Sequence, residues 1–349
     1  VYKDFSLIKK YSDNVVLYYK DGSYVLQKKH GLFKSVVKEL DIAFPIVHGT
    51  NVEDGVLQGY LQTIGIPYVG PNVYAAVVGQ DKAFMKDVWA SANLPIKNYV
   101  WFYDNDYRQD PEEVIKKVSK LKYPVIVKPA TTGSSVGINV CDDESSLKEA
   151  IDEAVQYDSK IVVEEVVEDL KEVNIAVMGN YEHQKVSEIE EVLSGNKFLT
   201  YTDKYIGGGK TKGKLKTPVK GASKGMASAS RKLPADLDDD VRKEVERVAK
   251  EAFKVLGSSG NSRIDFLIDR KDNKVYLNEI NSIPGSLAFY LWDAKDINFT
   301  KVLDDMINIG IKDYKKRVSK THSFETNILA GFASNGGLKG AKGVKGKLR

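Results

Sequence analysis

One stretch, residues 263–285, constrains the fold of this chain more than any other, because it reads as two strands joined by a polar turn. Its sequence is RIDFLIDRKDNKVYLNEINSIPG. Apolar and polar residues alternate in the first half, whereas the run Val-Tyr-Leu in the second half is continuous and is expected to be buried on both faces. The polar residues 269–273 supply the turn between the two strands.

Acidic and amide side chains gather in this hairpin. Antiparallel pairing of its strands would bring Asp265 near Glu279, with Asn281 at the end of the second strand. Two converging carboxylates and an amide need a cation, and hard oxygen ligands of this kind suit Mg2+ accompanied by substrate phosphates. The alternative, which this stretch alone leaves open, is a surface hairpin with scattered acids.

Composition limits the class of protein. A chain of 349 residues is long enough for two or three lobes, and its 42% apolar and 29% charged residues are ordinary for a soluble globular protein. The net charge of +4 does not by itself indicate a nucleic-acid partner. The single cysteine, Cys141, excludes a disulfide framework, and four scattered histidines argue against a zinc site.

The expected compartment is the reduced cytoplasm. Cysteine is scarce, no apolar run approaches the roughly 20 residues that span a membrane, and no signal peptide is visible. The chain begins at Val1 inside a strand-rich segment, so we expect that residues preceding it are absent.

The N-terminal part reads as a parallel α/β lobe. Short strands are expected at residues 14–19 and 24–27, and a short helix at residues 31–40. Residues 41–70 then give a strand, a helix and a second strand, a rhythm that predicts a parallel sheet with helices on its faces.

Three polar residues follow the first of these parallel strands, namely His48, Glu53 and Asp54. Ligands bind at the carboxyl ends of the strands in such sheets, which makes these residues candidates for substrate binding. For His48 taken alone, a loop histidine bonded to backbone groups is the favoured alternative.

A lysine followed by a glycine- and serine-rich loop marks the central part. Residues 122–129 (KYPVIVKP) read as a strand that carries Lys128, and residues 131–137 (TTGSSVG) form the loop. Backbone N–H groups and hydroxyls of such a loop can wrap a phosphate, and the lysine adds a positive charge. No GxxxxGK[ST] sequence is present, so the loop is not a P-loop, and a plain hairpin turn is the alternative.

The regular elements around this loop are helices expected at residues 82–92, 110–121, 144–156, 237–256 and 299–314. A buried strand at residues 161–167 runs into a linker whose backbone can hydrogen-bond a purine, and Glu172 follows it, placed to accept ribose hydroxyls. Further antiparallel strands are expected at residues 174–178 and 184–189.

Residues 197–234 are rich in glycine and lysine, a composition that cannot bury a core and is expected to be flexible. A solvated insert is one interpretation; the favoured one is a lid whose lysines neutralise a polyphosphate. The tail, residues 335–349, is similarly rich in glycine and lysine and is expected to be disordered.

Seven motifs in order carry a resemblance to a known family. They are FPIVHGTNVEDGVLQG, IPYVG, DK, YPVIVKP with GSSVG, FxxYxxKY, PAxL, and RID with NEINSIPG, together covering roughly residues 41–300. With these motifs the chain resembles the D-alanine–D-alanine ligases of the ATP-grasp superfamily.

The resemblance implies an α/β and α+β protein with an ATP-grasp fold, in which a partial parallel-sheet N-terminal lobe precedes two α+β lobes that sandwich the nucleotide. The implied lobes are residues 1–81, which lack their first strand and helix, 82–165 and 166–325, followed by the tail 326–349. A cytoplasmic homodimer that uses ATP, Mg2+ or Mn2+ and amino-acid substrates is expected.

The resemblance also implies roles for the nucleotide-binding residues. Lys82 and Lys128 would contact phosphates, with Ser134 and Ser135 in the loop above them. Residues 164–167 would border the adenine, through Glu164, Glu165 and Val167, and Glu172 would bind the ribose.

The residues implied for catalysis and metal binding come later in the chain. Asp265, Glu279 and Asn281 would hold Mg2+, and Arg263 would stabilise the transferring phosphate. Gly285 would offer backbone to an oxyanion, while Lys204 and Tyr205 would sit on the lid near phosphate and substrate.

Three departures from the family pattern qualify the substrate. The glycine-rich amino-terminal loop, with its glutamate for the first substrate's ammonium, is not in this chain, and the lid has about 28 residues between Tyr205 and Pro234. The run after Gly285 is SLAFYLW, bulkier than a small polar run, so Ser286 and Tyr290 could select an acceptor other than D-alanine. A non-catalytic nucleotide-binding homologue is the second hypothesis. A nucleic-acid-binding protein is the least favoured, because aromatic residues do not interleave with the lysines.

Overall fold

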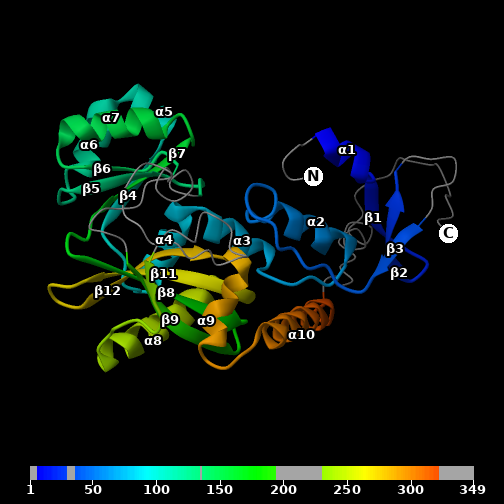
Figure 1. Ribbon diagram of the computed structural model, residues 1–349. Coiled ribbons are helices and arrows are strands. Elements are labelled where there is room, and N and C mark those ends of the chain that lie inside the picture. Colours follow the sequence, from blue (N-terminus) through cyan, green and yellow to red (C-terminus); the bar gives the residue numbers. More distant parts are fainter. Residues whose placement is uncertain (1–5, 30–35, 134–135, 194–229, 322–349) are drawn as a thin grey trace, which may run out of the picture. The chain divides into compact units, whose positions relative to one another are not determined.

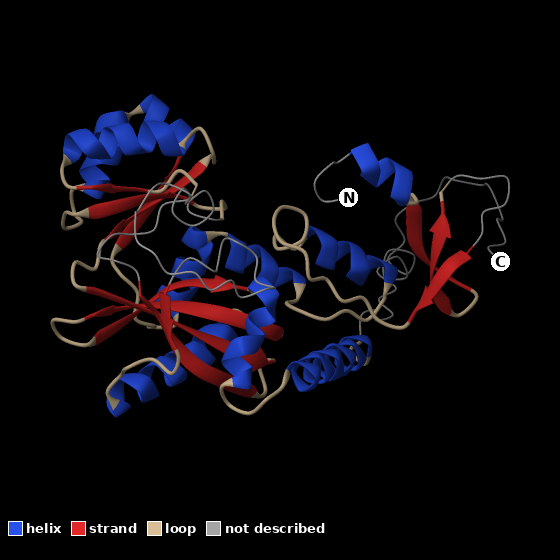
Figure 2. Cartoon of the chain, viewed as in Figure 1, coloured by secondary structure: helices blue, strands red, loops and turns tan. Residues whose placement is uncertain are grey.

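The computed structural model describes residues 6–29, 36–133, 136–193 and 230–321 (Figure 1). The chain divides into two compact units, Val1–Lys312 and Asp313–Arg349. Within the described residues the first unit contains three β-sheets, drawn red in Figure 2. No helix in the described ranges is both long enough and apolar enough to cross a membrane.

An antiparallel sheet follows the short helix α1 (Ser6–Tyr11). Its strands, in spatial order, are β1 (Val15–Lys20), β2 (Ser23–Lys28) and β3 (Val36–Leu40). The first two strands confirm the sequence prediction. The helix predicted over residues 31–40 was wrong for residues 36–40, which pair with β2. Val36 and Val37 are β-branched and favour extended backbone, and residues 31–35 lie outside the described ranges.

The predicted strand–helix–strand unit is reduced to its helix and one bridge. Helix α2 (Val56–Ile64) has the predicted bounds. The segments on either side do pair in parallel, but only through an isolated bridge between Ala43 and Tyr68. Ala43 donates its N–H to the Pro67 carbonyl at 2.8 Å and accepts from Val69 at 2.9 Å.

A four-stranded antiparallel sheet occupies the middle of the chain. Its strands, in spatial order, are β4 (Tyr99–Tyr103), β7 (Lys160–Glu165), β5 (Val125–Pro129) and β6 (Asn139–Cys141). Three helices pack on one face of it in Figure 1: α5 (Asp104–Gln109), α6 (Pro111–Val118) and α7 (Glu144–Ala154). Asp110 caps α6 by accepting the Glu113 N–H at 3.0 Å, and Pro111 occupies the first helical position, as the sequence predicted.

A five-stranded antiparallel sheet follows. Its strands, in spatial order, are β10 (Ser230–Lys232), β9 (Gln184–Leu193), β8 (Leu170–Gly179), β11 (Gly260–Asp269) and β12 (Lys274–Asn281). Helix α3 (Val73–Gln80) leads into α4 (Lys82–Ser91), which shares an apolar core with α8 (Asp239–Val255) and this sheet. Trp89, Phe253 and Phe266 are fully buried in that core.

The other face of this sheet is covered by α9 (Phe289–Asp293) and α10 (Phe299–Val318). Between β12 and α9 lies the turn η2 (Gly285–Ala288), in which three consecutive non-glycine residues have left-handed backbone: Ser286, Leu287 and Ala288, with φ of 52°, 54° and 48°. Such residues each cost about 1–2 kcal/mol. The burial of Leu287 and Ala288 against α9 and α10 offsets that cost.

Candidate active site

A row of polar side chains crosses four strands of the five-stranded sheet. Glu279 on β12 lies opposite Asp265 on β11, Asp265 opposite Asn174 on β8, and Asn174 opposite Glu190 on β9. The residues immediately before Asp265, Asn174 and Glu190 belong to the core shared with α8. Because side chains alternate along a strand, the polar row faces away from α8.

Asp265 is the best-connected member of this row. Its carboxylate accepts two hydrogen bonds from Arg263, through Nε at 2.6 Å and Nη2 at 2.7 Å, and a third from Asn281 Nδ2 at 3.1 Å. Burial lowers the pKa of Arg263, but Asp265 outweighs burial and raises it, so the guanidinium stays charged. The structure therefore brings Arg263, Asp265, Glu279 and Asn281 together, as the hairpin pattern predicted.

The four-stranded sheet contributes a cluster of buried ammonium groups. Glu164 on β7 is 2% exposed and forms ion pairs with Lys128 on β5 and with Lys86 on α4, the latter at 2.7 Å. Burial alone would raise the pKa of Glu164, but the two lysines outweigh it and lower the pKa to about 2. Two ammonium groups therefore share one carboxylate, which leaves the cluster with a positive charge.

Lys82, at the start of α4, adds a third ammonium group. Its Nζ donates to the Thr132 carbonyl at 2.7 Å, directly before the glycine-rich loop. Burial lowers the pKa of Lys82, and the carboxylate of Glu279 opposes that shift. Lys128 Nζ also donates to Asn278 Oδ1 on β12 at 3.3 Å. These contacts connect the cationic cluster to the hairpin that carries the acids.

A second polar cluster lies at the other end of the row. The buried Glu190 accepts from the Tyr290 hydroxyl at 2.7 Å and from Asn174 Nδ2 at 3.1 Å, and it pairs with Arg231 at 3.3 Å. The Arg231 guanidinium lies 5.3 Å from the Tyr290 ring centroid. The Arg263 charge reaches Tyr290 as well, so this cluster borders the phosphate side of the row.

Comparison with protein families decides the identity of this arrangement. Residues 6–71 match the family model described as D-ala D-ala ligase N-terminus, and residues 88–308 match the one described as D-ala D-ala ligase C-terminus. The chain belongs to the D-alanine–D-alanine ligase family. Its fold is the ATP-grasp fold that the sequence predicted.

Individual ligases agree with this membership. The D-alanine–D-alanine ligase of Thermosipho africanus is 36% identical over 310 residues, 89% of this chain and 77% of the relative. The structure of the Coxiella burnetii D-alanine–D-alanine ligase is similar with a TM-score of 0.71 and 25% identity, over 94% of this chain and 80% of that one. The VanG D-Ala:D-Ser ligase of Enterococcus faecalis gives a TM-score of 0.68 and 26% identity, over 85% and 79%.

The residues expected around the base and ribose lie on β7, β8 and the linker between them. The Glu164 side chain is committed to its two lysines, so only its backbone is left to border a base. Glu165 accepts from Asn98 at 3.1 Å and from the Lys122 N–H at 3.2 Å, and Val167 is buried. Glu172 lies on the same face of β8 as Asn174, two residues earlier.

The N-terminal candidates form a cluster of their own. His48 Nδ1 lies 3.4 Å from Glu53 Oε1, and this contact raises the pKa of the half-exposed imidazole. Glu53 also accepts the Gly49 N–H at 2.6 Å, while Asp54 accepts the Asn51 N–H at 2.7 Å. The hydrogen bonds described for these three side chains stay within residues 48–56, so they order this loop but do not connect it to the polar row.

Four candidates lie outside the described residues: Ser134, Ser135, Lys204 and Tyr205. The same holds for most of the proposed lid and for the tail from residue 326. Gly285 and Ser286 lie in the turn η2, which places both beside β11 and α9.

Sequence reasoning missed four residues of the site: Lys86, Glu190, Arg231 and Asn278. Lys86 lies one helical turn after Lys82 on a face that also buries Met85 and Trp89, a position where a lysine is unusual and could have been noticed. Glu190 had no such signal, because its importance depends on pairing with β8 across an irregular register.

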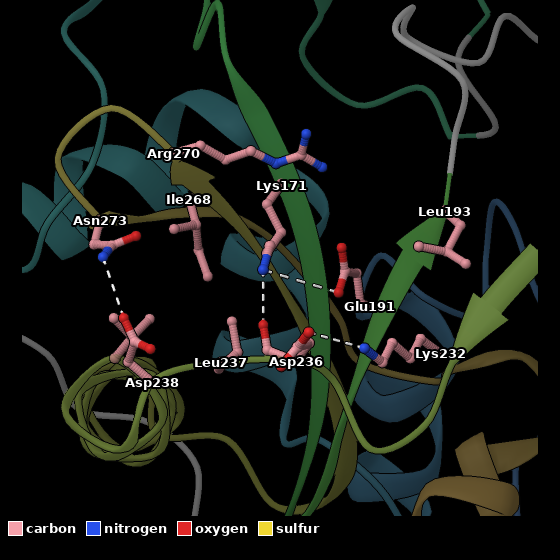
Figure 3. Close-up of a pocket in the computed structure, with 11 residues that line it drawn as sticks. Lys171, Glu191, Leu193, Lys232, Asp236, Leu237, Asp238, Ile268, Arg270 and Asn273 are labelled. Atoms are coloured by element: carbon pink, nitrogen blue, oxygen red, sulfur yellow. Dashed lines mark hydrogen bonds and ion pairs between the residues drawn. The ribbon is translucent and has the colours of Figure 1, made fainter.

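A pocket of about 520 Å3 opens elsewhere on the five-stranded sheet, as Figure 3 shows. None of the predicted site residues lines it. Its charged side chains are engaged with one another: Lys171 donates to the Asp236 carbonyl at 2.7 Å, and Lys232 pairs with the Asp236 carboxylate at 2.9 Å. It borders Leu193, the last residue described before residue 230, and we assign it no function.

Proposed function

We propose that the protein is an ATP-dependent D-alanine–D-alanine ligase that makes a dipeptide for peptidoglycan precursors. One observation supports this above all: the cationic cluster around Lys128 meets the acidic hairpin through the hydrogen bond to Asn278. A polyphosphate and its metal ion need both signs of charge at one place.

The donor set of the hairpin fits Mg2+. Asp265 and Glu279 are paired across the strands, and Asn281 lies beside Asp265. In the described part of the chain no three His, Cys, Asp or Glu side chains are grouped for a metal, so an amide and the phosphates would complete the shell. When bound, the ion would neutralise charge on the phosphate oxygens; Mn2+ is chemically equivalent here.

The chain's own residues account for the rest of the chemistry. A carboxylate oxygen of the first D-alanine attacks the γ-phosphorus of ATP and ADP leaves, which gives an acyl phosphate. Lys82, Lys128 and Arg263 neutralise the phosphoryl oxygens. The amine of the second D-alanine then attacks the carbonyl carbon, loses a proton and expels phosphate, while Arg263 and the backbone at Gly285 bind the oxyanion. The lid with Lys204 and Tyr205 excludes water from the acyl phosphate.

A different acceptor is the second candidate. Tyr290 is larger than the small polar residue expected at its position, and its hydroxyl is already bonded to Glu190. One of the similar structures is a D-Ala:D-Ser ligase. A D-alanine–D-X ligase therefore remains the alternative, with Ser286 and Tyr290 choosing the acceptor.

The remaining features of the proposal follow the family. The lobes are residues 1–81, 82–165 and 166–325, and the enzyme works as a homodimer in the cytoplasm on small amino-acid substrates, with no nucleic-acid or membrane partner. Sedimentation of the purified protein tests the dimer directly.

The activity is tested by measuring ADP release with MgATP and pairs of amino acids. D-Alanine alone is expected to stimulate release well above the ATP-only background and to yield the dipeptide. Stimulation only by D-alanine with a second amino acid would favour the alternative acceptor. ATP binding without stimulation by any amino acid would contradict a ligase and favour the non-catalytic homologue.

A further inference from the structure

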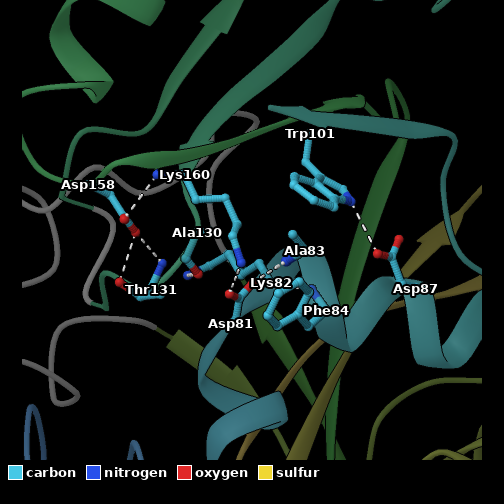
Figure 4. Close-up of polar contacts among 10 residues, drawn as sticks. All are labelled: Asp81, Lys82, Ala83, Phe84, Asp87, Trp101, Ala130, Thr131, Asp158 and Lys160. Atoms are coloured by element: carbon cyan, nitrogen blue, oxygen red, sulfur yellow. Dashed lines mark hydrogen bonds and ion pairs between the residues drawn. The ribbon is translucent and has the colours of Figure 1, made fainter. Parts of the chain in front are cut away.

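A closed ring of contacts lies behind the proposed phosphate-binding groups, at the start of the glycine-rich loop (Figure 4). It involves the first residue of β7, Lys160, and the residue two positions before it, Asp158. None of its members was a site candidate except Lys82. Its geometry links three separate segments, and each link is described below.

The first half of the ring runs through the Lys160 side chain. This side chain is 6% exposed, and its Nζ lies 2.5 Å from Asp81 Oδ2. The Phe84 ring centroid lies 3.3 Å from the same ammonium group, which gives a cation–π contact. Asp81 uses its other oxygen, Oδ1, to accept the N–H groups of Ala83 and Phe84 at 2.9 and 3.1 Å. One carboxylate therefore both caps α4 and binds Lys160.

The second half runs through Asp158. Its Oδ1 accepts the Lys160 N–H at 3.1 Å, and its Oδ2 accepts both the N–H and the hydroxyl of Thr131, at 2.6 and 2.8 Å. Thr131 is the first residue of the glycine-rich loop. Ala130, just before it, donates its N–H to the Lys160 carbonyl at 2.9 Å.

Lys82 closes the ring. It follows Asp81 and opens α4, its N–H donates to the Ala130 carbonyl at 3.0 Å, and its Nζ donates to the Thr132 carbonyl at 2.7 Å. The ammonium group expected to contact phosphate and the loop expected to cover it are therefore fixed to the same two residues of β7.

We propose that Lys160 and Asp158 are positioning residues for the nucleotide: they hold Lys82 and the start of the glycine-rich loop at a fixed separation. Stability alone is a weak reason for this arrangement, because a buried ion pair commonly contributes no more than apolar residues of similar size. Positioning is a stronger reason, since a displacement of about 1 Å at a phosphate-binding group can reduce a rate by up to about 100-fold. The inference rests on the proposed use of ATP.

The test compares Lys160→Met and Lys160→Arg with a matched control on the same helix. Asp87 also connects α4 to β4, by accepting from Tyr99 Oη at 2.5 Å and from Trp101 Nε1 at 3.1 Å, but its described bonds reach neither Lys82 nor Thr131. In Lys160→Met we expect the KM for ATP to rise about 10-fold, with the KM for D-alanine changing less than about twofold. Lys160→Arg, which keeps the charge, should restore most of the ATP affinity, and Asp87→Asn should leave both KM values near those of the wild type.

Equal KM values for ATP in folded Lys160→Met and Asp87→Asn would overturn the inference. If Lys160→Met does not fold, Asp158→Asn and Thr131→Val keep the Lys160–Asp81 pair and carry the same prediction; an unchanged KM for ATP in both would overturn it. The dissociation constant of MgATP, measured by calorimetry without amino acids, separates the two proposals. Wild-type binding that Lys160→Met weakens, without ligase activity, would support positioning and contradict the ligase; failure of the wild type to bind MgATP would overturn both.

Discussion

The four-stranded and five-stranded sheets handle buried charge in opposite ways. Next to the four-stranded sheet, the ammonium groups of Lys86 and Lys128 share the single carboxylate of Glu164. On the five-stranded sheet, the carboxylates of Asp265 and Glu279 are paired across strands with one guanidinium, Arg263, bonded to Asp265. One sheet therefore keeps a surplus of positive charge and the other a surplus of negative charge.

This difference teaches what each sheet is for. A surplus of charge in a buried place is costly unless a ligand neutralises it. A nucleotide phosphate would neutralise the first surplus and a divalent cation the second, and the two would also attract each other. Neither sheet has a complete site by itself, and the Lys128–Asn278 hydrogen bond is a direct connection between them.

The largest effect is expected from removing charge on the acidic sheet. Glu279→Gln keeps the shape but removes one carboxylate from the proposed metal site, so the rate of D-alanine-dependent ADP release should fall by about 10²–10³-fold, the usual loss for a group that stabilises charge in the transition state. The melting temperature should stay close to that of the wild type. Asp272→Asn, which changes an exposed acid in the turn of the same hairpin, is the control and should have full activity. A Glu279→Gln enzyme with near-normal turnover would contradict the site.

The next effect concerns stability on the cationic sheet. Lys86 is 1% exposed, and Lys86→Met removes one of the two partners of the buried Glu164. Breaking a buried ion pair costs about 3–5 kcal/mol, and the remaining Lys128 should keep the loss near the lower limit. Denaturant unfolding measures this change, with Lys148→Met as a surface control, because Lys148 pairs with Glu144 in solvent. Equal stability of the two variants would mean that Glu164 does not need Lys86.

A smaller effect is expected where the acidic row meets α9. Tyr290→Phe removes the hydroxyl that Glu190 accepts, and an unsatisfied buried acceptor costs about 1–3 kcal/mol. If Tyr290 also selects the acceptor, the KM for the second amino acid should change several-fold while the KM for ATP does not. Tyr60→Phe, which removes an exposed hydroxyl bonded to the Leu17 carbonyl, is the control. A change in the KM for ATP alone would place Tyr290 on the nucleotide side.

The smallest effect is expected at the exposed pair His48–Glu53, which lies outside both sheets. Glu53 raises the pKa of His48 above its ordinary value of 6.5. The pair therefore adds stability below about pH 6.5 and loses it as the pH rises through the pKa of the folded state. An NMR titration of the imidazole should show this raised pKa, and Glu53→Gln should lower it. An unchanged titration in the variant would exclude the contact in solution.

The sequence predicted most of the elements that carry the site. Alternation and the polar turn were sufficient for the β11–β12 hairpin and for the pairing of Asp265 with Glu279, because both depend on local order. Local order also explains the exact bounds of α2, which ends at Gly65 in the left-handed region.

Contacts between distant segments could not be predicted in this way. Lys86 meets Glu164 only because α4 packs against β7, and Glu190 meets Tyr290 across about 100 residues of chain. The wrong helix over residues 36–40 has a similar cause, since pairing with β2 decides their conformation. The roles of the individual site residues stay predictions, and Lys204 and Tyr205 lie outside the described residues.

The left-handed turn at Ser286, Leu287 and Ala288 has a consequence for engineering. A glycine at one of these positions would relieve backbone energy and is the substitution that a search for heat resistance would select first. It would also free the peptide groups beside Gly285 to rotate, and these are the groups proposed to meet the reacting carbonyl. Selection for durability and selection for turnover would therefore pull this short segment in opposite directions.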